Sequence, residues 1–137
     1  MPDRRLERLE AELVRPPFHA WLRPEPVSAT NDTVEIRLPI RPEMAGGTEP
    51  FFVHGGIIAA LIDLTGYAAA ACATGCPTPT LTLQIDYLKP AFGSMLLACG
   101  VVRQKGKRNA RVDVEIIAEG RIIALGRGTF AIMEDGQ

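Results

Sequence analysis

A histidine, two glycines and an acidic residue stand at a spacing that could support chemistry at a carbonyl group. Gly55 and Gly56 follow His54 directly, and Asp63 comes nine residues after the histidine inside a long apolar run. A helix that is apolar all round has no face for water, so we expect the protein to carry Asp63 into a dry environment. A desolvated carboxylate suits a general base that activates water, or a nucleophile. The alternative is a structural carboxylate held by backbone N–H groups or by Thr65.

The two glycines stand where a helix that starts after His54 has backbone N–H groups without an intrahelical acceptor. Without Cβ atoms they would let a ligand approach these donors, and the positive end of the helix dipole would stabilise a carbonyl oxygen that becomes negative. Alternatively, the glycines only make a tight turn and the histidine is structural. Nine residues of ideal helix rise about 13.5 Å and end half a turn round, so one chain cannot bring His54 and Asp63 to the same atom. If both serve one site, two chains must supply them.

Small side chains surround the acidic residue on the expected helix. Tyr67 is the one aromatic residue on this face and could line a pocket, although a lone aromatic on an apolar helix is more often part of the core. Such a face lets another backbone or a slim substrate chain approach Asp63. The small residues three, four and seven positions away are Ala59, Ala60, Gly66 and Ala70.

An amphipathic helix is expected near the N-terminus, over residues 3–14. Leu6, Leu9 and Leu13 form one stripe of it, and Asp3 is its candidate N-cap. We expect this helix to lie on the outside of the molecule. Together with the short apolar turn that follows, it makes a helical extension over residues 1–22.

Alternation of apolar and polar residues predicts strands on both sides of the central helix. Asn31-Asp32 is a hairpin turn signal, whereas residues 41–53, rich in glycine and proline, are expected to form a loop. In the strand after the helix, strict alternation puts Thr80 on one face with Thr82 and leaves the opposite, apolar face to pack on the helix. The expected strands cover residues 27–30, 33–39, 79–90, 95–104, 110–118 and 122–133.

This order of elements predicts an α+β fold in which a curved, mostly antiparallel sheet of five to six strands wraps one long central helix. With 137 residues, the chain fits a single domain over residues 1–137. A sheet of this size covers only one side of the helix. The simplest cover for the other side is a second copy of the chain, so we expect a homodimer with the helices facing each other near a two-fold axis.

Composition excludes several classes of function. The net charge of −1 gives no reason to expect nucleic acid or an anionic membrane as a partner. The apolar run over residues 57–73 is at the lower limit for a bilayer span, but it contains Asp63 and is rich in alanine rather than leucine. The charged N-terminus lacks the features of a signal peptide, so we expect a cytoplasmic protein. Three cysteines without a CxxC pair and two histidines predict neither a disulfide framework nor a metal site.

These motifs resemble the hotdog-fold acyl-CoA thioesterases of the phenylacetic-acid-degradation type. The resemblance rests on His54-Gly55-Gly56, the acid nine residues after the histidine, and Thr-Leu-Thr-Leu-Gln-Ile-Asp-Tyr-Leu-Lys-Pro at 80–90. It covers roughly residues 30–133 and includes Gly-Arg-Gly-Thr-Phe at 126–130. It implies a hotdog fold and hydrolysis of aryl- or medium-chain acyl-CoA to the free acid and coenzyme A, without a metal or another cofactor.

The resemblance also implies roles for the central motif. Asp63 would act as base or nucleophile on the thioester, and Thr80, at the start of the next strand, would orient the attacking water. The backbone N–H groups around Gly55, with His54, would polarise the carbonyl. In this family the acid and the helix start come from different subunits, and tetramers are common, so we expect a dimer of dimers.

Substrate binding is assigned to residues around this centre. Thr48 stands where the family often has Asn or Gln; it can still donate a hydrogen bond, but with shorter reach. Lys107 and Arg108, in the one basic cluster of the chain, would hold the phosphates of coenzyme A. Alternatively, this cluster is a solvated hairpin tip. The remaining candidate substrate-binding residues are Gly56, Tyr67 and Thr82.

Two other functions fit the same fold. A hotdog dehydratase pairs a histidine with an acid in a different motif context, which this sequence lacks. A non-catalytic acyl-CoA-binding protein would keep the fold and the pocket but would need no carboxylate at position 63. The presence of Asp63 favours an enzyme.

Overall fold

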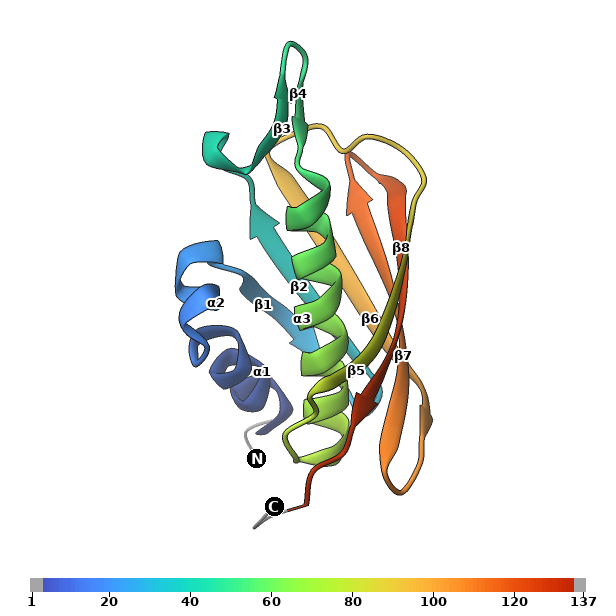
Figure 1. Ribbon diagram of the computed structural model, residues 1–137. Coiled ribbons are helices and arrows are strands. Elements are labelled where there is room, and N and C mark those ends of the chain that lie inside the picture. Colours follow the sequence, from blue (N-terminus) through green and yellow to red (C-terminus); the bar gives the residue numbers. More distant parts are fainter. Residues whose placement is uncertain (1–3, 135–137) are drawn as a thin grey trace.

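The computed structural model describes residues 4–134 and contains one long helix held in the concave side of an antiparallel sheet (Figure 1). The proposed cap Asp3 lies outside the described residues. In chain order the elements are α1 (Arg4–Val14), α2 (Pro17–Leu22), β1 (Glu25–Ala29), β2 (Thr33–Pro39), the 3-10 helix η1 (Pro42–Met44), β3 (Ala45–Thr48), β4 (Phe51–Val53), α3 (Gly55–Thr74), β5 (Thr80–Tyr87), β6 (Met95–Lys105), β7 (Asn109–Ala118) and β8 (Arg121–Ala131).

The main sheet has six strands in the order β1-β2-β6-β7-β8-β5, and every neighbouring pair is antiparallel. The predicted α+β architecture, with its central helix and six-stranded sheet, is therefore confirmed. The β7–β8 turn consists of Glu119 and Gly120, both with positive φ (50° and 75°), which is the backbone that a two-residue hairpin requires. This order leaves β5, the strand that follows the central helix, at one edge of the sheet.

Helix α3 begins directly after His54, as the sequence predicts. His54 caps its first turn, and Gly75 ends it in the left-handed conformation, φ 73°, with its N–H bonded to the carbonyl of Ala71. One side of the helix packs on the concave face of the sheet through fully buried side chains such as Leu61 and Ile62. Contact is close because a Cβ at Gly66 would overlap the ring of Phe130 on β8. By length and composition α3 would also pass as a membrane span, with mean hydropathy 1.7, but 56% of that window is buried within the fold.

The N-terminal helix is more deeply packed than expected. Leu9 is 0% and Leu13 is 2% exposed, and α1 contacts both α3 and β1, so it covers one flank of the central helix (Figure 1). Between α1 and α3 the carboxylate of Glu12 is buried, with Arg8 and Arg15 each 3.2 Å from one of its oxygens. The helix therefore lies on the outside, as expected, and its buried leucines join the core.

The expected loop over residues 41–53 contains structure of its own. After η1, strands β3 and β4 form a separate two-stranded sheet, which projects beyond the start of α3 (Figure 1). Its strands were missed because each is short and lacks alternation. The end of this segment is anchored to the core, since Val53 is buried and its N–H donates to the carbonyl of Ala91.

Candidate active site

Asp63, in the middle of α3, and Thr80, at the start of β5, form the centre of the candidate site. The hydroxyl of Thr80 donates a hydrogen bond to Oδ1 of Asp63 at 2.6 Å, a length typical of a bond to an ionised carboxylate. The expected dry environment does not hold in the single chain: Asp63 is half-buried, because this side of α3 faces away from the sheet. The pair opens into a pocket of about 190 Å³, which is also lined by Pro16, Phe18, His19, Ala60, Leu64 and Tyr67.

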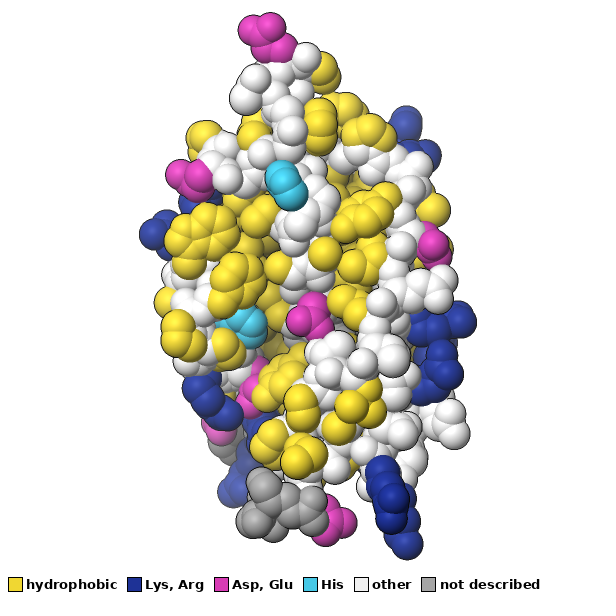
Figure 2. Space-filling model, viewed as in Figure 1, with side chains coloured by type: hydrophobic (Ala, Val, Ile, Leu, Met, Phe, Trp, Pro, Cys, Tyr) yellow, Lys and Arg dark blue, Asp and Glu magenta, His cyan; other side chains and the backbone are white. Residues whose placement is uncertain are grey.

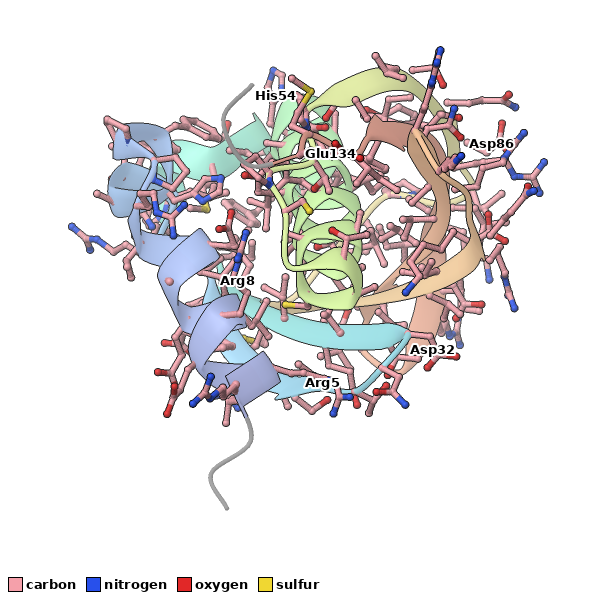
Figure 3. The ribbon with its side chains drawn as sticks, turned by 90° about the horizontal axis from the view of Figure 1, so that it is seen from below. Arg5, Arg8, Asp32, His54, Asp86 and Glu134 are labelled. Carbon is pink, nitrogen blue, oxygen red and sulfur yellow. The ribbon has the colours of Figure 1, made fainter. Side chains whose placement is uncertain are left out.

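A β-bulge gives Thr80 its orientation. The register of β5 against β8 shifts between Thr80 and Thr82, so the alternation of faces is reset there. Leu83 packs on the core, whereas Asp86, on the face it shares with Thr82, points away from α3 (Figure 3). The expectation that Thr80 and Thr82 share a face is therefore wrong, and only Thr80 meets Asp63.

At the start of α3, His54 serves as an N-cap. Its Nδ1 accepts the N–H of Gly56 at 2.8 Å, so in the neutral imidazole the proton sits on Nε2, which can donate outward. A Cβ at Gly56 would approach Nδ1 to 3.0 Å and crowd this cap. The N–H of Gly55 has no acceptor among residues 4–134, while its carbonyl accepts from the hydroxyl of Tyr87 at 2.8 Å. Of the two glycine N–H groups that we predicted as donors, that of Gly56 is used by the cap and that of Gly55 remains available to a ligand.

The other candidate substrate residues lie apart from the Asp63 pocket. Thr48 is exposed at the turn between β3 and β4. Lys107 and Arg108 are exposed in the β6–β7 turn, and the neighbouring Lys105 reaches the carbonyl of Ala73 near the end of α3. A helix of 20 residues is about 30 Å long, so one chain holds its basic cluster and its helix start at opposite ends.

Tyr67 lines the pocket one helical turn beyond Asp63. Burial and a hydrogen bond to the carboxylate of Glu12 raise the pKa of the Tyr67 phenol above its ordinary value of 10.0. The phenol therefore stays neutral at physiological pH. Arg8, which pairs with the same carboxylate, lies on the side of α1 that faces α3 (Figure 3).

His19 lines the pocket, although nothing in the sequence favoured it as a site residue over a structural or surface one. It comes from α2, and its Nδ1 lies 2.9 Å from the carbonyl oxygen of Glu12. The only sequence signal was Pro16-Pro17, where the chain turns back. That break does not reveal which part of the central helix the histidine reaches.

Comparisons with known proteins identify the class. The model of the thioesterase superfamily matches residues 52–124. A candidate esterase from Halobacterium salinarum is 30% identical over 119 residues, which are 78% of each chain. The acyl-coenzyme A thioesterase PaaI of Escherichia coli K12 is 36% identical over 77 residues, 55% of this chain and 54% of PaaI. The chain belongs to the thioesterase superfamily.

Solved structures agree with this assignment. The X-ray structure of a thioesterase-superfamily protein, 32% identical, matches with a TM-score of 0.91 over 96% of this chain and 100% of that one. The E. coli PaaI structure matches with a TM-score of 0.85 over 95% and 94%, and at 22% identity it supports the fold alone. The protein therefore has the hotdog fold, and the enzyme class implied by the sequence resemblance, thioester hydrolase, is confirmed.

Proposed function

We propose that the protein hydrolyses acyl-CoA thioesters with aryl or medium-chain acyl groups to the free acid and coenzyme A. The observation that carries the proposal is the 2.6 Å hydrogen bond from Thr80 to Asp63, which orients a carboxylate toward a pocket in a chain of the thioesterase superfamily. The name of the relative PaaI, an acyl-coenzyme A thioesterase, supports coenzyme A as the leaving group. Asp63 acts as the base that activates water, or as the nucleophile, and Thr80 holds it in place.

The start of α3 supplies the oxyanion site in this proposal. Within residues 4–134 neither the N–H of Gly55 nor the Nε2–H of His54 has an acceptor, so both can bind a thioester oxygen that becomes negative. Eight residues of helix separate Gly55 from Asp63, a rise of about 12 Å, so they do not reach the same carbonyl group within one chain. Each active site then combines the helix start of one protomer with Asp63 of its partner.

Three surface features support the homodimer that this requires. The face of the molecule that carries the exposed side of α3 is largely apolar (Figure 2). Strand β5 is at the edge of the sheet, and in the described part of the chain no strand pairs with its outer side, which can therefore pair with another strand. Large apolar side chains on and just after β5 are exposed: Leu81 by 58%, Tyr87 by 53% and Leu88 by 51%. A dimer of dimers, built through other surfaces, completes the proposed assembly.

Substrate contacts follow from an antiparallel pair of α3 helices. With Asp63 of one helix beside the start of the other, the C-terminal end of the first helix extends about 16 Å past that start. Lys107 and Arg108 lie near this end, at a distance from the oxyanion site that the long coenzyme A chain can span. There they hold the phosphates of coenzyme A. Tyr67 lines the acyl end of the pocket, and Thr48 reaches the substrate from the β3–β4 hairpin. Gly56 contributes because, without a Cβ, it leaves room for the His54 cap. Thr82 is on the other face of β5 and does not line the pocket, so the proposal gives it no contact with the substrate. The chemistry needs no metal or redox cofactor, and the setting is cytoplasmic.

The test is a panel of acyl- and aryl-CoA esters incubated with the purified protein, with the free thiol of coenzyme A as the readout. Thiol should appear with at least one class of ester, and the relative kcat/KM values define the acyl group. A folded protein that releases no thiol from any ester would contradict the proposal.

Valine substitutions at Thr80 and Thr82 form a matched pair, which tests whether the bulge matters because it places the hydroxyl of Thr80 on Asp63. Thr80→Val removes the hydroxyl that orients Asp63, and we expect kcat to fall about tenfold to a hundredfold, because a small misplacement of a catalytic group is that costly. Thr82→Val changes the same residue type on the opposite face of β5 and should leave kcat within about twofold. Steady-state thiol release measures both; equal effects of the two substitutions would argue against the assigned role.

A further inference from the structure

Asp63 and His19, from distant parts of the chain, line the same pocket, and each carries a hydrogen-bond acceptor without a partner among residues 4–134. Oδ1 of Asp63 is occupied by Thr80, while Oδ2 has no partner within the described part of the chain. The second acceptor is on His19. Its Nδ1 lies 2.9 Å from the Glu12 carbonyl oxygen, and because a carbonyl only accepts, Nδ1 carries the proton. In the neutral imidazole, Nε2 is then an unprotonated acceptor, and no residue from 4 to 134 bonds to it.

The other polar groups of the pocket are already engaged. The hydroxyl of Thr80 donates to Asp63, and the phenol of Tyr67 interacts with the buried carboxylate of Glu12. Oδ2 of Asp63 and Nε2 of His19 are therefore the two acceptors of the pocket that have no partner among the described residues. A water molecule has two O–H donors, and if it gives one to Asp63 and the other to His19, its lone pairs remain available for attack.

We propose that His19 is a positioning residue which, together with Asp63, holds the attacking water by its two hydrogens. The inference rests on the proposed thioester hydrolysis. The water oxygen bonds to the thioester carbonyl carbon as Asp63 takes one proton, and the C–S bond then breaks with its electron pair on sulfur. The proton held by Asp63 passes to that thiolate, so water and acyl-CoA give acid and free thiol.

The N-terminal segment is built to hold His19 in place. Glu12, whose carbonyl fixes the imidazole, is 1% exposed and is paired with Arg8 and Arg15. At the other end of α2, the guanidinium of Arg41 donates to the carbonyls of Trp21 and Leu22, at 2.6 Å and 3.0 Å. The segment that carries His19 is thus held on both sides of the histidine. A side chain that positions water needs a rigid support of this kind.

Two amide substitutions separate this role from a structural one. The amide of His19→Asn stands near Nδ1, so it keeps the bond to the Glu12 carbonyl but places no acceptor in the pocket. The amide of His19→Gln reaches the place of Nε2 and keeps the acceptor. We expect kcat to fall about tenfold to a hundredfold in the Asn variant, with KM within about twofold, and to stay within about fivefold of wild type in the Gln variant. A purely structural anchor predicts the reverse order.

The melting temperature of each variant is measured together with its rate. His19→Ala removes both the bond to the Glu12 carbonyl and the acceptor in the pocket, so its kcat should fall as far as that of the Asn variant. This third variant keeps the test decisive if the Asn substitution disturbs folding. If the wild type hydrolyses an ester and the Asn and Ala variants match it, or Gln is the slower amide variant, the role of His19 is overturned while the proposed function stands. If the wild type hydrolyses no ester in the panel, the proposed function falls, and this inference falls with it.

Discussion

Asp63→Asn is expected to lower kcat on the best acyl-CoA ester at least about a hundredfold, the size of effect that general acid–base groups produce. Asparagine has nearly the same shape, and its amide oxygen can still accept the hydroxyl of Thr80, so the local structure should persist. What is lost is the basicity and nucleophilicity of the carboxylate. Thiol release at saturating substrate, with the melting temperature of the variant, measures the effect.

Asp86→Asn is the matched control for this substitution. Asp86 is an exposed acid on β5 that points away from α3, so the same change of charge should leave kcat within about twofold. Unchanged turnover in a folded Asp63→Asn variant would remove the carboxylate from the mechanism. It would favour the non-catalytic acyl-CoA-binding alternative only if the wild type also failed to turn over.

Local sequence patterns were enough to predict the scaffold. The apolar run between His54 and Gly75 carries its own start and stop signals, and the strands around it alternate with period two, so helix α3 and the six-stranded sheet follow from neighbouring residues alone. The position of Asp63 on that helix was predictable for the same reason. Each of these inferences uses interactions within a few residues along the chain.

The details that complete the pocket depend on long-range or single-residue effects. One extra residue in β5 turns Thr80 toward Asp63, and a bulge of this kind has no composition of its own. His19 reaches the pocket because α1 and α2 fold back onto α3, which depends on the burial of Leu9 and Leu13 rather than on any spacing to Asp63. The partial exposure of Asp63 also follows from tertiary structure, since it depends on what covers the outer side of the helix.

Gly55→Pro isolates the second half-site. Gly55 is the first residue of α3, where proline is well tolerated, and His54 already has the extended backbone, φ −59° and ψ 135°, that proline requires before it. A Cβ at Gly55 would lie 3.5 Å from the ring of Tyr87, an ordinary contact. Proline removes only the free N–H, and we expect kcat to fall about a hundredfold or more, as for other oxyanion donors. Gly55→Ala keeps that N–H and is the control.

Mixing Asp63→Asn chains with Gly55→Pro chains should restore activity. If each site takes its helix start and its carboxylate from different protomers, a heterodimer has one intact site and one doubly altered site. After complete exchange at equal amounts, about half of the dimers are mixed, so the rate should reach about a quarter of wild type. Sites contained within one chain would show no recovery.

A chain that carries both substitutions, mixed equally with wild type, gives the complementary result. With shared sites, every mixed dimer has two damaged sites, because the altered chain spoils one with its proline and the other with its asparagine. Only the wild-type homodimers then work, and the rate should be about a quarter of an all-wild-type sample. With independent sites each mixed dimer would keep one working site, and the rate would be about half. The two mixtures together decide whether the start of α3 and Asp63 are two halves of one active site.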